Sequence, residues 1–295
     1  MAKRSSKPAA RQGRRPESRW QRDGWWTTGL AFAAPFVLYL RTLAPTIYNL
    51  DSAELTTAAA TGGLVRATGY PLYLLIGRVW SLLPIGDVGY RMNLLSAVCG
   101  ALTVALGERI LRRLGVGVWA RLAALGLLAV AQFFWALALI AEVYTLHTAI
   151  LAGVILALLR WAEQPAPGRL ALATFLMGIG FGNHVATVLA APGCLWFVLS
   201  TEPRKALAPR SLGLAAAALA AGLAVYLYLP LVYWTKPAFK YVGWFDAAGH
   251  FEQERDRPRR RVERHPRIGA ALEAVRGVGV HAEGLGPAAD PPPVE

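Results

Sequence analysis

The chain has 295 residues and a formal net charge of +13, yet only 17% of its residues are charged and 55% are hydrophobic. A soluble domain carries charge on about a quarter of its residues, so this composition excludes an ordinary soluble enzyme. Several apolar stretches reach the roughly 20 residues that a helix needs to cross a bilayer. Much of the positive charge lies in short segments beside those stretches, which indicates membrane topology and not nucleic-acid binding. The sequence therefore predicts an all-α polytopic membrane protein.

Three regions follow one another along the chain. Residues 1–24 are basic and polar, and we expect a disordered cytoplasmic tail there. Residues 25–250 form a membrane domain with about seven spans. The spans run approximately from Trp26 to Leu43, Met92 to Leu111, Trp119 to Ile140, Val143 to Trp161, Leu170 to Gly182, Val185 to Ser200 and Leu212 to Trp234. Residues 251–295 are rich in Arg, Pro, Gly and Ala without periodicity, which predicts a second disordered tail.

The basic residues between the spans predict the orientation. The short turns near residues 141 and 183 contain no Lys or Arg. By the positive-inside rule, these turns and the long loop of residues 44–91 lie outside the cytoplasm. Within that loop, Tyr70–Leu83 is apolar but too short to span, so we expect an amphipathic helix at the outer surface. The loops assigned to the cytoplasm hold Arg109, Arg112, Arg113, Arg121, Arg160, Arg169, Arg204, Lys205 and Arg210.

Two carboxylates follow the first span directly. Asp51 and Glu54 are three residues apart and would share one face of a helix. Ionisable groups at a membrane surface are costly to hold and are usually functional. In the alternative interpretation, Asp51 or Ser52 only caps the start of a helix in a solvated loop.

Further polar residues are predicted at the same outer ends of the spans. Glu142 and Tyr144 follow the third span, and Asn183 and His184 lie between the fifth and sixth. Simpler interpretations stay open: a carboxylate favoured by a helix N-terminus for Glu142, an aromatic belt residue for Tyr144, and a hydrogen-bonded interfacial histidine for His184. Three glycines at 178, 180 and 182 resemble a phosphate loop, but no strand precedes them, so close helix packing is expected. The cysteines at 99 and 194 are expected to be packed thiols, and no metal-site or nucleotide-sugar motif is found.

Five motifs in order suggest a family. They are Pro45–Leu55, Gly69–Tyr73, Arg91–Ala97, Ala141–Tyr144 and Gly182–His184. Over residues 28–250 the chain resembles the transmembrane protein O-mannosyltransferase family, first catalogued as a domain of unknown function and part of the GT-C glycosyltransferase superfamily. The family usually has His-Pro-Pro before Gly-Tyr-Pro-Leu-Tyr, where this chain has Arg66, Ala67 and Thr68. Family members generally continue beyond this point, so the resemblance implies a C-terminally truncated member.

The resemblance implies a GT-C-like helical bundle that moves a sugar, mannose, from a polyprenyl-phosphate donor to a protein hydroxyl outside the cytoplasm. No metal or other cofactor is expected, and the partners are membrane lipid, the lipid-linked sugar and an acceptor protein, with no nucleic acid. The expected location is a bacterial inner membrane. Asp51 is the candidate general base, and Glu54 is its helper or a group that positions the acceptor. Arg66, Arg78 or Arg91 would hold the donor phosphate. The remaining candidate substrate-binding residues are Tyr70, Asn93, Glu142, Tyr144, Asn183 and His184.

Two other classes of function stay open. A transporter or lipid flippase would favour ionisable residues near the bilayer midplane in broken helices. Here the acidic groups gather at one surface, and only His147 lies clearly inside a span. A non-catalytic scaffold, or an inactive truncated family member, is the other alternative.

Overall fold

The computed structural model describes residues 25–48, 51–66, 68–235, 237 and 239. The predicted tails of residues 1–24 and 251–295 lie outside the described residues. Within these ranges every regular element is a helix, and no strand is present. This confirms the all-α fold class. The helices are α1 (Trp25–Thr42), α2 (Asp51–Thr61), α3 (Pro71–Trp80), α4 (Val88–Arg113), α5 (Val118–Val130), α6 (Gln132–Ala138), α7 (Val143–Glu163), α8 (Pro167–Asn183), α9 (Thr187–Thr201), α10 (Pro203–Ala206), α11 (Pro209–Leu223), the 3-10 helix η2 (Ala224–Leu227) and α12 (Tyr228–Trp234).

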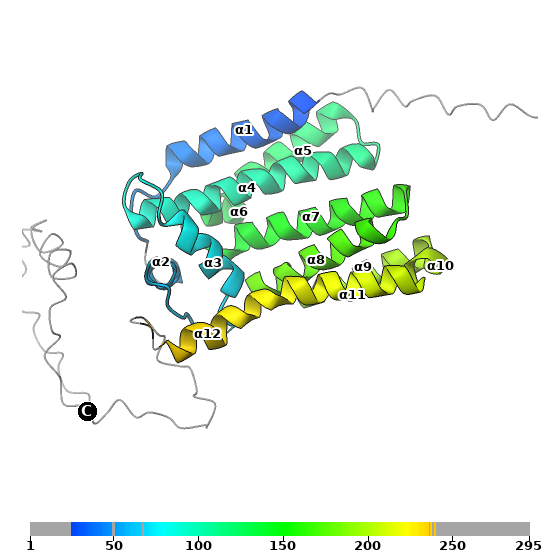
Figure 1. Cartoon of the computed structure of the whole chain (residues 1–295). Helices are drawn as coiled ribbons and strands as arrows, with labels where there is room; N and C mark the ends of the chain where they lie inside the picture. The colour runs from blue at the N-terminus through cyan, green and yellow to red at the C-terminus, as the bar shows by residue number, and fades with distance from the viewer. Residues whose placement is uncertain (1–24, 49–50, 67, 236, 238, 240–295) are drawn as a thin grey trace, which may run out of the picture. The chain divides into compact units, whose positions relative to one another are not determined.

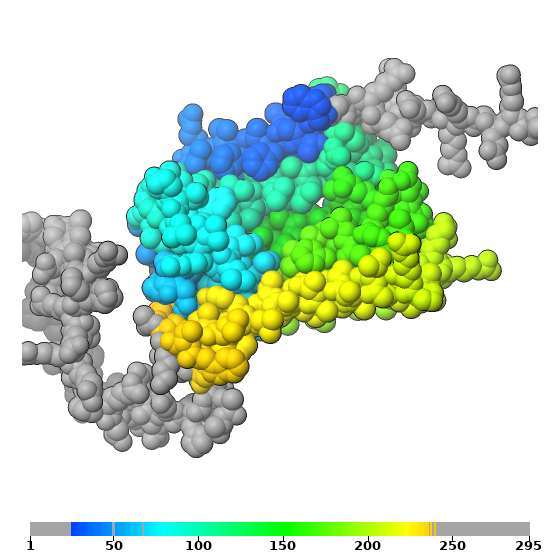
Figure 2. Space-filling model, viewed as in Figure 1, coloured from blue at the N-terminus to red at the C-terminus, as the bar shows by residue number. Residues whose placement is uncertain are grey.

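The long helices pack side by side in a row. Figure 1 shows α1, α4, α7, α8 and α11 in this order, and each of them contacts the next. Helices α2 and α3 lie across one end of the row, where α3 contacts α4, α8 and α12. In Figure 2 this cap, in blue to cyan, meets α12, in orange. The cap is the feature that positions the polar residues of the site.

Apolar side chains form both the core and the outer surface. One buried cluster joins α1, α4, α5 and α6, a second joins α2, α3 and α4, and a third joins α7, α8, α9 and α10. Large apolar side chains also face outward: Leu127, Phe133, Leu189 and Trp196 are each 71–84% exposed. A soluble protein rarely exposes so many large apolar groups, whereas a lipid-facing surface requires them. This is a membrane protein.

Helices occupy all seven of the segments that the sequence predicts as spans. Three of them are long and apolar enough to cross a membrane by length and composition: α4, α7 and the continuous stretch Pro209–Trp234. The pair α5–α6 makes a fourth if the bent pair is counted as one span. Helices α1, α8 and α9 do not meet this criterion, so the number seven stays a prediction.

The third predicted span is not one continuous helix. Helices α5 and α6 meet at Ala131 with a bend of 65°, although the sequence has no proline or glycine there. The buried hydroxyl of Tyr39 on α1 donates to the carbonyl of Ala129 at 2.8 Å. In an unbroken helix that carbonyl would accept the N–H four residues later. The tyrosine therefore satisfies a backbone group that the break leaves open.

Close contact between α8 and α11 explains the glycine-rich run. A Cβ built on Gly178 would lie 2.7 Å from the Leu219 carbonyl oxygen and 3.0 Å from the Cα of Gly222. A Cβ on Gly222 would lie 2.6 Å from the Phe175 carbonyl oxygen. The backbones thus meet where neither residue has a side chain, as in other membrane helix pairs. The prediction of close packing is confirmed.

Candidate active site

The acidic pair lies in the first turn of α2, and an arginine bridges it. A guanidinium nitrogen of Arg66, in the loop between α2 and α3, pairs with the Asp51 carboxylate. Its Nε lies 3.5 Å from Glu54 Oε2, and its backbone N–H donates to Glu54 Oε1 at 2.6 Å. The Asp51 side chain is 48% exposed and the Glu54 side chain only 13%. Asp51 is therefore the more accessible of the two carboxylates, and Glu54 holds the loop.

These residues line a small pocket against the start of α7. The lining comes from α2, the α2–α3 loop and the α6–α7 connection, and consists of Asp51, Glu54, Leu55, Val65, Arg66, Tyr70, Glu142, Val143 and Tyr144. Its volume is about 10 Å³, enough for about one water molecule. A group larger than a water molecule fits only if a lining side chain moves, and both partners of the Arg66–Asp51 ion pair line the pocket.

Glu142 is the third carboxylate of the pocket and precedes α7. Its backbone N–H donates to Ser96 Oγ of α4 at 3.1 Å, which fixes its place. Burial raises the pKa of Glu142, although the backbone N–H of Val143 and the charge of Arg66 act in the opposite direction. A carboxyl group with a raised pKa keeps its proton to higher pH and can donate a hydrogen bond.

Four rings form what we call the histidine–tyrosine cluster beside this pocket. The ring of His184 stacks on Tyr70 with centroids 6.0 Å apart, and lies 5.4 Å from Tyr144 and 5.2 Å from His147. Tyr70 has φ 40°, in the left-handed region, and among the described residues no other non-glycine has a positive φ. Such backbone strain persists where surrounding contacts hold it, and it gathers at functional sites.

The hydrogen bonds of His184 define its protonation. The backbone N–H of Ala186 donates to His184 Nδ1 at 3.1 Å, so the neutral ring carries its proton on Nε2. Burial lowers the pKa of His184, which favours that neutral form. The ring can therefore offer Nε2–H as a hydrogen-bond donor.

Two of the predicted substrate-binding residues hold loop backbone instead of facing the pocket. The guanidinium of Arg91 donates to carbonyl oxygens of the loop 81–86 at 2.6–2.9 Å. The side-chain amide of Asn93 donates to the carbonyls of Ala44 and Thr46, both at 2.9 Å. Both side chains hold the backbone of the segments that flank the cap. Contact of either side chain with the sugar donor stays a prediction.

Asn183 and Arg78 also contact backbone. The amide of Asn183 donates to the Val143 carbonyl at 3.0 Å and ties α8 to α7. Arg78 of α3 donates to the carbonyl of Ala60 at the end of α2. Arg66 is thus the only one of the three candidate phosphate-holding arginines that lines the pocket. His147 and Ser96 join the site without having been chosen from the sequence.

Among the described residues, no group of three or more His, Cys, Asp or Glu side chains lies close enough to hold a metal ion. Asp51, Glu54 and Glu142 do line one pocket, with Arg66 between them as the counter-charge. The arrangement combines an accessible carboxylate, a cation and a carboxyl group of raised pKa. These are the groups that a proton transfer coupled to the departure of an anion needs.

The fold and the site together define a polytopic helical membrane protein with acid–base groups gathered at one end of its helix row. The family described as the N-terminal domain of protein O-mannosyl-transferase TMEM260 matches residues 51–207, more than half of the chain. The chain belongs to this family. A mouse relative, protein O-mannosyl-transferase TMEM260, is 29% identical over 221 residues, which cover 70% of this chain and 31% of the mouse protein. The chain thus spans about a third of that relative's length, and no solved structure matches it.

Proposed function

We propose that the chain is a glycosyltransferase that moves mannose from a polyprenyl-phosphate donor to a protein hydroxyl on the non-cytoplasmic side of the membrane. The name of the mouse relative supports mannose transfer to protein. The single observation that carries the proposal is the Asp51–Arg66–Glu54 bridge in a pocket at the end of the helix row. A lipid-linked donor carries its phosphate beside the membrane surface, which is where the proposal puts this pocket.

The proposed reaction uses Asp51 as the general base. The Asp51 carboxylate takes the proton from the acceptor hydroxyl as its oxygen attacks the anomeric carbon of the mannose. The bond between that carbon and the phosphate oxygen breaks, and the phosphate leaves with the electron pair. Arg66 stabilises the negative charge that develops on the leaving phosphate. A positioned base contributes about 10²–10⁴-fold to the rate.

Donor binding would itself activate the base in this scheme. In the structure, Arg66 pairs with Asp51, and the pocket has room for about one water molecule. A phosphate offers Arg66 two charged oxygens in bidentate geometry, so it competes with Asp51 for the guanidinium. Loss of the ion pair leaves Asp51 with a more basic carboxylate. During the exchange, Glu54 keeps Arg66 in place by accepting a hydrogen bond from the backbone N–H of Arg66.

The other lining residues would bind the sugar and the acceptor. Tyr70 and Tyr144 present aromatic faces on which a sugar ring can pack, and His184 keeps both rings in position. Glu142, whose pKa is raised by burial, would hydrogen-bond a hydroxyl of the sugar or the acceptor. The scheme needs no cofactor, because Arg66 neutralises the leaving group. Addition of a chelator should leave transfer unchanged.

The orientation is part of the proposal. In a variant lacking Cys99 and Cys194, a cysteine at Thr68 should react with an impermeant maleimide from outside. A cysteine at Gly117, in the loop between α4 and α5, should react only after permeabilisation. The reverse pattern would place the pocket in the cytoplasm and contradict the proposal. The bacterial inner membrane stays a prediction, to which a mouse relative gives no support.

A transfer assay tests the chemistry. The purified chain should release polyprenyl phosphate from polyprenyl-phosphate mannose and glycosylate a peptide with Ser or Thr. Asp51→Asn should lower the rate by about two orders of magnitude. Asp87→Asn is the matched control, because Asp87 caps α4 at the same end through Tyr90 N–H, and asparagine caps equally well.

Three results would contradict the proposal. Equal rates for the Asp51 and Asp87 variants would exclude Asp51 as the general base. Turnover with a nucleotide sugar in the absence of lipid would exclude a lipid-linked donor. Movement of the intact lipid-linked sugar across sealed vesicles, with its glycosidic bond unbroken, would favour the transporter alternative. Retention of donor binding with loss of transfer in Asp51→Asn would instead support the division of roles between Asp51 and Arg66.

A further inference from the structure

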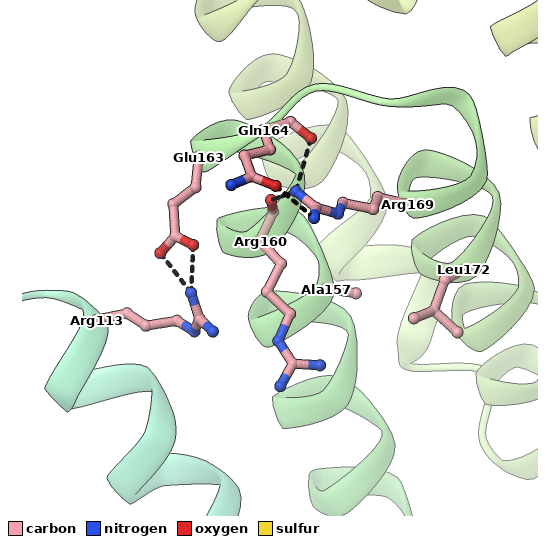
Figure 3. A pocket seen from close by; sticks show the side chains of 7 residues that line it. All are labelled: Arg113, Ala157, Arg160, Glu163, Gln164, Arg169 and Leu172. Carbon is pink, nitrogen blue, oxygen red and sulfur yellow. Dashed lines mark hydrogen bonds and ion pairs between the residues drawn. The ribbon is translucent and has the colours of Figure 1, made fainter.

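A second, larger pocket lies at the far end of the helix row from Asp51. It is formed by the end of α4, the end of α7 and the start of α8, and has a volume of about 500 Å³. Its lining, drawn in Figure 3, consists of Arg113, Ala157, Arg160, Glu163, Gln164, Arg169 and Leu172. That size suits a small ligand or a lipid headgroup.

The charges of this pocket do not balance. Three arginines face one glutamate, and Glu163 pairs with Arg113. Arg169 donates to the Arg160 and Gln164 carbonyls at 3.2 and 2.9 Å, so its guanidinium is held by neutral groups. The pocket therefore keeps excess positive charge after its internal contacts are made.

Arg160 is the group that the fold leaves available. Within the described part of the chain, its guanidinium makes no hydrogen bond or ion pair, and Figure 3 shows it extending into the space beside Arg113 with no dashed line. Arg109 lies near enough to Arg112, Arg160 and Arg113 for their positive charges to repel its own. A half-buried guanidinium among like charges is stabilised when it binds an anion.

An apolar strip continues from the pocket along α8. Leu172 lines the pocket and is 46% exposed, and Phe175, one turn further, is 37% exposed. Residues three apart share a helix face, so Leu172 and Phe175 lie on the same face of α8 as Arg169. The apolar strip therefore leads from the arginines toward the middle of the row. A ligand with a phosphate at the arginines and a hydrocarbon chain along the strip would satisfy both surfaces.

We infer that this pocket binds the phosphate headgroup of an anionic membrane lipid, with Arg160 as its principal contact. Basic pockets between membrane helices are a recognised form of headgroup site. The site is separate from the proposed catalytic pocket. Glu142 and Arg160 are at opposite ends of α7, about 27 Å apart at 1.5 Å per residue. Lipid binding here does not depend on the proposed transfer reaction.

The test measures lipids retained by the full chain in detergent, by native mass spectrometry. The two probes are phosphatidic acid and phosphatidylcholine with the same acyl chains. We expect one phosphatidic acid to be retained, with at least about tenfold preference over phosphatidylcholine. Arg160→Gln should weaken phosphatidic acid binding by about tenfold or more, as expected for loss of a charge-assisted contact. Because Arg160 has no side-chain partner among the described residues, the variant should fold normally.

Two further variants separate a specific pocket from general positive charge. Arg204→Gln removes the same charge from the exposed α10 and should leave binding within about twofold. Glu163→Gln frees Arg113 from its ion pair and should strengthen binding several-fold. Equal weakening by the Arg160 and Arg204 variants would overturn the proposal, as would a loss of binding in Glu163→Gln.

An excess of inorganic phosphate distinguishes the two sources of the same chemistry. Retention of phosphatidic acid in that excess is expected, because Leu172 and Phe175 contact only a ligand with a hydrocarbon chain. Complete displacement by inorganic phosphate would show a site for a free anion and overturn the assignment to a lipid.

Discussion

A buried ion cluster that joins α1, α4 and α5 gives the most quantitative prediction. Glu108 of α4 is fully buried and accepts hydrogen bonds from Thr27 at 2.9 Å and Thr28 at 2.6 Å, both on α1. Arg112 donates to it at 3.0 Å, and the fully buried Arg121 of α5 lies 3.3 Å away. One carboxylate thereby joins three helices.

Glu108→Gln should destabilise the protein strongly. Glutamine keeps the size of the side chain and can hydrogen-bond both threonines, accepting from one through Oε1 and donating to the other through Nε2. Two guanidinium groups nevertheless lose their shared counter-charge. Removal of one partner from a buried ion pair costs about 3–5 kcal/mol, and the retained hydrogen bonds place this case near about 3 kcal/mol. For a domain of this size, each kcal/mol shifts the midpoint of thermal unfolding by about 2–4 °C. The expected decrease is therefore about 6–12 °C.

The assay is thermal unfolding in detergent, with Glu163→Gln as the matched control. Glu163 pairs with Arg113 at the same end of the row, but its side chain is 50% exposed. An exposed pair contributes about 0–1 kcal/mol, so the control should shift by less than about 4 °C. Adding Arg121→Gln to the Glu108 variant should cost less than the two changes summed, since each removes the other's partner. Equal shifts for Glu108→Gln and Glu163→Gln would refute the reasoning.

Two further predictions concern packing and pH. Gly178→Ala should lower the free energy of unfolding by about 1–3 kcal/mol, because its Cβ forces α8 away from α11. Gly213→Ala, whose Cβ meets nothing within 4 Å, should be neutral or stabilising. The midpoints of thermal unfolding compare the two variants. The folded-state pKa of His184 lies below its ordinary 6.5, so unfolded chain binds more protons, and the stability that His184 contributes above pH 6.5 is lost as pH falls below it. His184→Gln, which can still accept from Ala186, should lose less stability between pH 7 and 5.5 than the wild type, and an equal loss in both would contradict the assignment.

The helices were predictable because hydropathy alone decides where a chain can cross a membrane. The predicted spans Met92–Leu111 and Val143–Trp161 lie inside α4 and α7, which extend them by a few residues. The break at Ala131 could not be predicted, since its stabilising contact comes from Tyr39, more than eighty residues earlier. A periodicity argument has no access to such a tertiary hydrogen bond.

The site was predictable only in part. Asp51 and Glu54 were identifiable because a spacing of three fixes their relation on a helix whatever surrounds it. Arg91 and Asn93 have the same chemistry as binding residues, and only coordinates show that they contact backbone carbonyls. His147 was visible as a polar residue inside a span, but its approach to His184 depends on how α7 meets the α8–α9 turn.

Glu108 changes the argument for orientation. The positive-inside count treated Arg112 and Arg121 as free cytoplasmic charges, yet both interact with a buried carboxylate. The orientation signal therefore rests on the more exposed arginines of that end, Arg160 and Arg169 among them. A solvated or lipid-facing charge interacts with the membrane surface potential, whereas a charge neutralised inside the bundle does not. The bias survives this correction, because the turns at the other ends of α7 and α8 contain no Lys or Arg.

The separation of the two polar ends matches the membrane that they are proposed to face. Helix α7 has 21 residues and a length of about 30 Å at 1.5 Å per residue. The hydrocarbon core of a bilayer is also about 30 Å thick. If α7 crosses that core, Glu142 at its start and Arg160 near its end both reach the headgroup regions, on opposite sides. The carboxylates would then meet a lipid-linked phosphate at one surface, while Arg160 would meet a lipid phosphate at the other. Neither group would have to be held inside the hydrocarbon, where an ionisable side chain is most costly.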